Sequence, residues 1–247
     1  MVASAGQLNG KVVVVTGAGR GIGAATSRLL AERGARLVLG ARSEHELKAV
    51  ADSIDGDVAI RPTDVTRPDE VQSLVDLGVE QFGRLDVFVA NAGIAISAPL
   101  ASGDIADWNT MIDVNLRGVL HGIAAAIPFF QRQGSGHFVT VASTSALKWL
   151  PDQGVYAATK AGVRALCEIL RQELAPQGLR ATMVYPGFTN TDFIASTRDP
   201  DVLAAAIARR DEIAMSPNAI AEAIGFAIAQ PEAVDVGEIV VRPTVQP

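Results

Sequence analysis

The chain of 247 residues is poor in cysteine, histidine and charge, and each shortage excludes a class of protein. Its single cysteine, Cys167, rules out an intramolecular disulfide framework, and its three histidines lie too far apart in sequence for a metal site. Charged residues make up only 19%, with 21 Lys and Arg against 27 Asp and Glu. The cysteine and histidine content therefore predicts no bound metal. Because the net charge is −6 and no basic cluster is present, we also expect no nucleic-acid partner.

Long apolar runs and linkers are also missing. No apolar run approaches the roughly 18 residues that a membrane span needs, and residues 1–10 lack the basic start and apolar core of a signal peptide. The chain has no Pro/Gly/Ser-rich linker, internal repeat or low-complexity tract, while 49% of its residues are hydrophobic, enough for a large core. We therefore expect one cytoplasmic domain over residues 1–247.

Short apolar runs alternate with longer segments of helical periodicity along the whole chain. The first run, residues 11–16, is rich in β-branched residues, which is typical of a strand buried on both faces of a parallel sheet. The alternation predicts a doubly wound α/β domain, with a sheet of about seven parallel strands and helices on both faces. The other candidate strands are residues 35–41, 57–61, 85–90, 137–142, 180–185 and 238–241, and the candidate helices are residues 21–33, 44–53, 68–82, 104–131, 155–174 and 217–230.

Residues 187–215 form the one long segment without a clear pattern. The segment follows a predicted strand directly, and open α/β sheets bind their ligands beside the carboxyl ends of the strands. Loops of this length are usually functional. We interpret the segment as a lid over a substrate, in which Arg198 could meet an acidic group. The alternative is a fixed surface loop that ends in a helix over residues 202–210.

A glycine-rich sequence, TGAGRGIG, occupies residues 16–23 between the first strand and the first helix. Glycines allow the backbone to approach a pyrophosphate closely, and the helix N-terminus then meets the negative charge. Such a sequence is also typical of a flexible turn, but its place between a strand and a helix favours a dinucleotide-binding site.

The spacing of these glycines, GxxxGxG, resembles that of the short-chain dehydrogenase/reductase family, and further motifs of this family follow in order over nearly the whole chain. They are Asp64, the triplet Asn91, Ala92 and Gly93, then Asn115 within VNLRG, Ser143, the YxxxK pair Tyr156 and Lys160, and Pro186-Gly187 with Thr191. One position departs from the family pattern NNAG, because residue 90 is alanine. The resemblance implies a Rossmann-type fold and an oxidoreductase that moves a hydride between a nicotinamide and a carbonyl or alcohol.

Tyr156 and Lys160 are the candidate proton-transfer pair, since residues four apart share one face of a helix. A phenol has a pKa near 10, and a nearby ammonium together with an oxidised nicotinamide would lower that pKa. Such pairs are often mere surface neighbours, but Ser143 at a strand end favours a site. The resemblance implies that Tyr156 is the acid/base, that Ser143 binds the substrate oxygen, that Lys160 binds the ribose, and that Asn115 holds a relay water.

The predicted cofactor is NADP(H) rather than NAD(H). NAD-selective relatives place an acidic residue at the end of the second strand, where this chain has Ala41 followed by Arg42. Arg42 and Arg20 could pair with a 2′-phosphate, although both could also be solvated surface charges. The expected cofactor-binding residues are Gly17, Arg20, Gly21, Ile22, Gly23, Arg42, Asp64, Val65, Asn91, Ala92, Gly93, Tyr156, Lys160, Pro186, Gly187, Thr189 and Thr191.

The sequence leaves the substrate open. Candidate contacts are Ser145, Trp149, Phe188 and Phe193, of which Trp149 faces either the substrate or the solvent. The tail, residues 218–246, is similar to that of a branch with 3-hydroxy acid and serine dehydrogenases and clavulanic aldehyde reductases, which implies a small aldehyde or 3-hydroxy acid. The family also implies a homotetramer or a dimer, formed through the long helices and the last strand.

Two other classes of function remain. One is a non-catalytic NADP-binding sensor, which the intact set of Asn115, Ser143, Tyr156 and Lys160 argues against. The other is an epimerase, dehydratase or lyase on the same fold. We interpret His121 as a packed or interface residue and Cys167 as a small buried hydrophobe.

Overall fold

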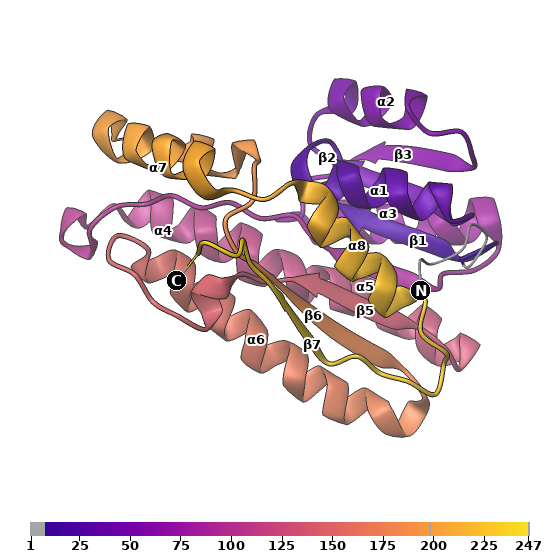
Figure 1. Ribbon diagram of the computed structural model, residues 1–247. Helices are drawn as coiled ribbons and strands as arrows, with labels where there is room; N and C mark the ends of the chain where they lie inside the picture. The colour runs from indigo at the N-terminus through magenta and orange to yellow at the C-terminus, as the bar shows by residue number, and fades with distance from the viewer. Residues whose placement is uncertain (1–7, 198, 247) are drawn as a thin grey trace.

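The computed structural model describes residues 8–197 and 199–246, which form a seven-stranded sheet between two layers of helices (Figure 1). All strands are parallel, in the order β3-β2-β1-β4-β5-β6-β7, and the predicted doubly wound fold is confirmed. The strands are β1 (Val12–Thr16), β2 (Arg36–Ala41), β3 (Val58–Pro62), β4 (Val87–Ala90), β5 (His137–Val141), β6 (Arg180–Pro186) and β7 (Glu238–Val241).

Helices cover both faces of the sheet. One face carries α3 (Pro68–Phe82), α5 (Gly118–Gln133) and α6 (Gly154–Leu174), and the other carries α1 (Gly21–Glu32), α2 (Glu44–Asp52) and α8 (Pro217–Ile228). Two more helices, α4 (Ile105–Ile112) and α7 (Pro200–Ile213), lie beyond the carboxyl ends of the strands (Figure 1). In the part of the chain that the structure describes, no helix is both long and apolar enough to cross a bilayer.

The β-branched run of β1 is buried because its successive side chains enter two different cores. Val12 and Val14 pack beneath α3, α5 and α6, whereas Val13 and Val15 pack beneath α1 and α8. All four side chains are fully buried. Each buried valine stabilises the fold by about 1.5–3 kcal/mol, so the sheet is anchored at its centre, where β1 lies between β2 and β4.

The helix predicted over residues 104–131 is interrupted in the structure. It consists of α4, a π-helical turn (Asp113–Arg117) and α5. The Asn115 side chain within the turn accepts a hydrogen bond from the Ile94 N–H (2.8 Å) and donates one to the Ile94 carbonyl (2.9 Å). Single π-helical turns of this kind are frequent at functional sites. Because the turn adds only one residue, the apolar periodicity of the sequence does not reveal it.

Residues 187–215 contain more regular structure than a loop. They include a short 3-10 helix (Asp192–Ser196) and α7, which extends beyond both ends of the helix considered at residues 202–210. The Asp199 carboxylate caps α7 by accepting hydrogen bonds from the Asp201 and Val202 N–H groups. Among the described side chains of α7, only that of Ile213 is buried. The helix in this segment is confirmed, and lid closure stays a prediction.

Candidate active site

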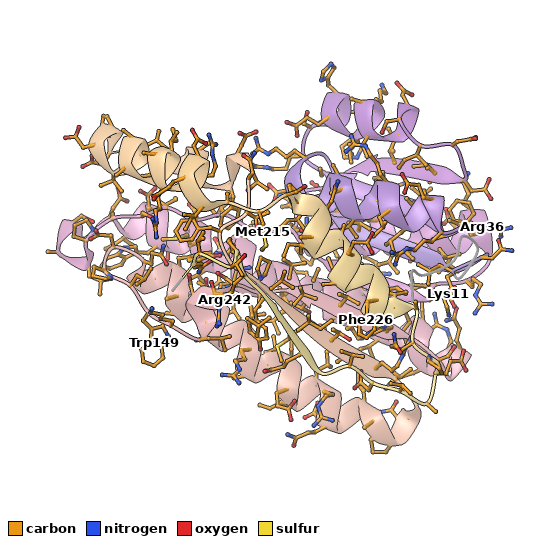
Figure 2. The ribbon with its side chains drawn as sticks, in the orientation of Figure 1. Lys11, Arg36, Trp149, Met215, Phe226 and Arg242 are labelled. Carbon is orange, nitrogen blue, oxygen red and sulfur yellow. The ribbon has the colours of Figure 1, made fainter. Side chains whose placement is uncertain are left out.

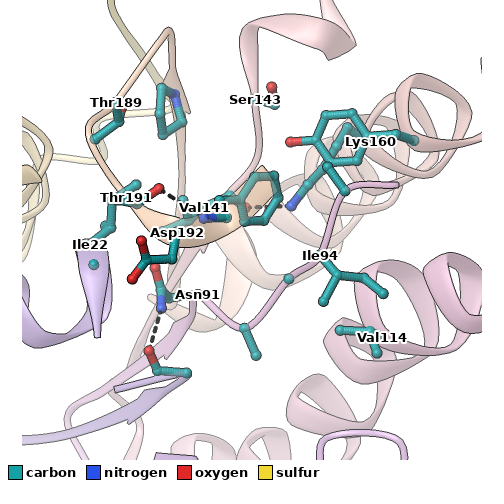
Figure 3. Close-up of a pocket in the computed structure, with 18 of the residues that line it drawn as sticks. Ile22, Asn91, Ile94, Val114, Val141, Ser143, Lys160, Thr189, Thr191 and Asp192 are labelled. Atoms are coloured by element: carbon teal, nitrogen blue, oxygen red, sulfur yellow. Dashed lines mark hydrogen bonds between the residues drawn. The ribbon is translucent and has the colours of Figure 1, made fainter. Parts of the chain in front are cut away.

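A cavity of about 1240 Å³ lies at the carboxyl ends of the strands (Figure 3). Its wall is made by the turn after β1, the segments that follow β2 to β6, and residues from α4, α6 and α7. Small-molecule pockets usually measure roughly 300–1,000 Å³, so this cavity has room for a dinucleotide and a second, smaller molecule. Every predicted site residue belongs to the wall except Gly23, Asn115 and Trp149.

The glycine turn is pressed against the end of β4. The Asn91 side chain donates hydrogen bonds to the Thr16 carbonyl (2.9 Å) and the Gly17 carbonyl (3.1 Å). Figure 3 shows one of these bonds as a dashed line from Asn91. A Cβ atom on Gly17 would lie 2.9 Å from the Ala92 Cα, and one on Gly23 would collide with the Gly17 carbonyl. The turn therefore requires glycine at both positions, and Gly23 acts from just behind the wall.

At the opposite side, Ser143, Tyr156 and Lys160 come together as predicted. Ser143 follows β5, and its side chain lies close enough to the buried Tyr156 hydroxyl to influence the pKa of that phenol. The Lys160 Nζ donates to the Val141 carbonyl (3.0 Å) and lies 6.0 Å from the centre of the Tyr156 ring. Both side chains project from α6 toward the cavity, and Figure 3 shows Lys160 and Ser143 on the same wall.

Asn115 lies behind this wall and is fully buried. In addition to its two bonds with Ile94, its side chain donates to the Thr159 Oγ1 (3.2 Å). A Cβ atom on Gly93 would lie 3.3 Å from the Asn115 Oδ1 and 3.5 Å from the Lys160 Nζ. Gly93 thus allows the π-helical turn and α6 to approach the end of β4.

Burial shifts the pKa values of the proton-transfer pair in opposite directions. Burial raises the pKa of Tyr156 to about 12, and the hydrogen bond from Ser143 opposes this rise. Burial lowers the pKa of Lys160 to about 8. In the protein alone, the pKa of Tyr156 is therefore raised by burial, and the lowering predicted from Lys160 is not found.

The side of the cavity near β2 carries charges of both signs. Arg20 and Arg42 are exposed members of the wall, and Glu46 from α2 joins them. Deeper in, the Asp64 carboxylate accepts hydrogen bonds from the Thr66 N–H (2.9 Å) and hydroxyl (2.8 Å). His121 is half-buried and bonded through its Nδ1 to the Val65 carbonyl (2.8 Å), which is compatible with its interpretation as a packed or interface residue.

The segment after β6 is held by the C-terminal tail. Gly187 is tightly covered, because a Cβ atom there would collide with the Gln246 side-chain oxygen. This oxygen accepts a hydrogen bond from the Phe188 N–H (2.9 Å), and the Thr189 hydroxyl donates to the Gly187 carbonyl (2.9 Å). Thr191 then contacts the glycine turn, since a Cβ atom on Gly21 would lie 3.0 Å from its Cγ2.

Three of the four candidate substrate contacts line the cavity, namely Ser145, Phe188 and Phe193. The Phe193 ring meets the Tyr156 ring edge to face, with 5.7 Å between ring centres. Trp149 does not join them, because its side chain is 74% exposed and points to solvent (Figure 2). Its neighbours Lys148 and Leu150 are exposed as well, but they belong to the cavity wall. Arg198 lies outside the described residues.

Several wall residues have no signal in the sequence that points to a site. They are Glu46, Arg209, Arg210, Arg242 and Gln246. Glu46 stands three residues after the helix-capping Ser43, a spacing that indicates only a helix start. Cys167 is buried, as predicted. Among the described residues, no group of three or more His, Cys, Asp or Glu side chains is placed to hold a metal ion.

Comparisons with known proteins identify the family of the chain. Residues 11–201 match the short chain dehydrogenase family. An uncharacterized oxidoreductase of Listeria monocytogenes is 40% identical over 245 residues, which cover 97% of this chain and 99% of that protein.

Three solved structures have the same fold. An alcohol dehydrogenase of Thermococcus sibiricus, complexed with 5-hydroxy-NADP, is 32% identical (TM-score 0.85; 96% of this chain and 98% of that chain). A closed serine dehydrogenase complexed with NADP+ is 26% identical (TM-score 0.90; 96% of each chain). A short chain dehydrogenase/reductase of Burkholderia phymatum, in complex with NAD, is 28% identical (TM-score 0.85; 95% and 89%). The protein therefore belongs to the short-chain dehydrogenase/reductase family and is an oxidoreductase.

Proposed function

We propose that the protein transfers a hydride between NADP(H) and a carbonyl or alcohol carbon of a small molecule. One observation carries this proposal: a glycine turn suited to a pyrophosphate and a buried Ser143, Tyr156 and Lys160 group border the same cavity. A binding protein needs no proton-transfer pair, so the second feature favours an enzyme over a sensor.

The residues of the cavity fit a dinucleotide. The turn that only glycine can form leaves its backbone N–H groups at the start of α1, where no described side chain caps the helix. Arg20 and Arg42 would meet the adenosine end, and Lys160 and the segment from Pro186 to Thr191 would meet the nicotinamide end. The cofactor, when bound, supplies the hydride in reduction and accepts it in oxidation.

The chain itself supplies the proton and positions the substrate oxygen. In reduction the Tyr156 hydroxyl donates its proton to the oxygen of the carbonyl, and the Ser143 hydroxyl holds this oxygen by a second hydrogen bond. The Lys160 ammonium favours the resulting phenolate. Both N–H donors of the Asn115 side chain are already used by Ile94 and Thr159, so a relay water would bind at an oxygen atom of Asn115.

The proton-transfer pair leads to a prediction about pH. The raised pKa of Tyr156, about 12, keeps its phenol neutral in the protein alone, and the positive charge of an oxidised nicotinamide should lower this pKa by about one unit or more. Since the chain has two tyrosines, the near-ultraviolet absorbance of wild type minus Tyr156→Phe isolates this group. A titration that is the same with and without the oxidised cofactor would contradict the proposed activation.

Replacement of the proton donor tests the function itself. Tyr156→Phe should reduce turnover by on the order of 10² or more, with NADPH affinity unchanged, because the ring stays and only the hydroxyl is lost. Tyr185→Phe is the matched control, since Tyr185 is the other tyrosine and lies outside the cavity wall, bonded to Glu238. A screen of aldehydes and ketones with NADPH provides the assay. Parallel loss of cofactor affinity and turnover would mean that Tyr156 has another role.

NADP(H) is the cofactor that the charges favour. Arg42 and Arg20 line the cavity beside the end of β2, where Ala41 stands in place of an acidic residue. Solved relatives are described with either NADP or NAD, so the preference rests on these side chains.

Reversal of the charge at residue 42 tests the preference. Arg42→Asp should weaken NADPH binding by roughly 1.5–3 kcal/mol, because a charge-assisted contact with the 2′-phosphate becomes a repulsion. NADH lacks this phosphate and serves as the internal control in the same titration. Equal losses for the two cofactors would show that Arg42 does not contact the phosphate.

Residues 187–215 would act as a lid in this reaction. The ends of the segment are joined, because the Met215 N–H donates to the Phe188 carbonyl (3.0 Å) and the Asn190 N–H donates to the Met215 carbonyl (2.9 Å). Between these ends, α7 reaches the cavity through Ala206, Arg209 and Arg210. With Ile213 as its one buried side chain among those described, α7 has few contacts that oppose movement.

Amide hydrogen exchange can detect such closure. Binding of NADP+ with a product alcohol should slow exchange in residues 191–213, whereas the Phe188 amide should be protected in both states by Gln246. Gln246→Ala should expose that amide, and Gln246→Glu, which keeps an acceptor, should not. Equal protection of residues 191–213 in the free and bound protein would rule out a lid.

The substrate would be a small aldehyde, ketone or 3-hydroxy acid. Phe188, Phe193 and Leu150 offer apolar contacts in the cavity that also contains Tyr156, and Lys148 adds a positive charge to its wall. The similarity to a serine dehydrogenase supports a polar, acid-bearing substrate within this range.

We also propose that the protein assembles as a homotetramer or a dimer. Exposed apolar side chains lie on α5 and α6 (Leu120, 41%; Ile169, 54%) and on α8 and the edge strand β7 (Phe226, 54%; Val240, 43%). Burial of such side chains between copies would stabilise an assembly.

A cytoplasmic location fits a reaction that draws on the cell's pool of reduced nicotinamide.

A further inference from the structure

The side of the cavity proposed for the adenosine ribose contains a carboxylate as well as two guanidinium groups. A Cβ atom on Gly19 would lie 3.0 Å from the Glu46 Oε2 and 3.5 Å from the Ala41 Cβ, so the Glu46 carboxylate lies directly over the glycine turn. Glu46 lines the same wall as Arg20 and Arg42. None of the ion pairs found between described residues involves any of these three side chains.

The start of α2 fixes Glu46 in this place. Ser43 caps the helix by accepting a hydrogen bond from the Glu46 N–H (3.3 Å). Leu47 and Val50 are buried in the core beneath α1, and this contact sets the rotation of the helix. Glu44 and Lys48 therefore face solvent, where they form an ion pair (2.6 Å), while Glu46 faces the glycine turn.

A carboxylate here discriminates between the two nicotinamide cofactors in the opposite sense to Arg42. It repels the 2′-phosphate of NADPH but accepts a hydrogen bond from the free ribose hydroxyl of NADH. Selective NAD sites place such an acid about 20 residues after the glycines, at the end of the second strand. In this chain that position is occupied by the uncharged Ala41. The carboxylate on this side of the glycine turn comes instead from Glu46 of α2.

We propose that Glu46 is a specificity-determining residue that keeps the cofactor site open to NADH beside NADPH. The proposal rests on the cofactor site of the proposed function. Arg42 and Arg20 attract the phosphate, Glu46 limits that attraction, and the ratio of the two affinities depends on their balance.

Glu46→Gln tests this balance, because it removes the charge and keeps the shape and the helix cap. Calorimetry with adenosine 2′,5′-bisphosphate and with 5′-AMP measures the adenosine side without hydride transfer. We expect the bisphosphate to bind about 5- to 30-fold more tightly to the variant, and 5′-AMP to bind equally or less tightly. The kcat/KM ratio of NADPH to NADH should rise by a similar factor.

Glu44→Gln is the matched control, since it makes the same charge change on the same helix but outside the cavity wall. It should alter either affinity less than about twofold. An unchanged affinity ratio in Glu46→Gln, or an equal shift in Glu44→Gln, would overturn the role of Glu46 while leaving the proposed function intact. Failure of the wild type to bind either nucleotide would overturn both proposals.

Discussion

Asn91 donates hydrogen bonds to two carbonyl groups of the glycine turn, and the Thr16 hydroxyl in return accepts bonds from the backbone of residues 91 and 92. These contacts lock the carboxyl ends of β1 and β4 together where the strand order reverses. The lock operates only because Gly17 has no side chain. The same contact fixes the position of the residues that follow Asn91. Among them, Gly93 lets the side chains of Asn115 and Lys160 come close to the end of β4. The positions of both sides of the cavity therefore depend on this one contact between the ends of β1 and β4.

The wall that contains Ser143, Tyr156 and Lys160 carries a cost in stability. Lys160 is buried, and the low polarity around it depresses its pKa to about 8. A base with a depressed folded-state pKa binds fewer protons than the unfolded chain, so its cost is complete below about pH 8 and disappears as the pH rises toward its ordinary pKa. The surrounding cores offset this cost, since the strands on which the wall is built are buried on both faces. Active sites commonly carry such a penalty.

Local sequence patterns were sufficient to predict the doubly wound parallel sheet and the position of the glycine turn, because periodicity and strand ends determine both. The meeting of Ser143 with Tyr156 and Lys160 was expected mainly from the resemblance to the family. The local patterns failed where one residue changes the path of the backbone. The π-helical turn at Asn115 inserts one residue into a continuous apolar pattern, and the outward path of the chain at Trp149 depends on the fold of its loop.

A second kind of failure concerns residues that reach the cavity from a distance. Glu46 lies in the first turn of an ordinary capped helix, and Gln246 lies in a short polar tail. Their contacts with Gly19 and Phe188 depend on tertiary packing, for which the neighbouring sequence contains no signal. The same packing opposes the pKa shift expected for Tyr156, because burial of the phenol is a property of the whole wall.

The loose attachment of α7 also bears on how this protein can change over evolutionary time. Substitutions on a helix with one buried side chain among those described alter few contacts of the core, so most of them should be tolerated by the fold. The glycine turn and the Tyr156 wall have no such freedom, since their neighbours lie within bonding or contact distance. Mutation can therefore reshape one wall of the cavity while the chemistry opposite is preserved. Such a division allows a lineage to acquire new substrates by drift in a single segment, without passing through unstable intermediates.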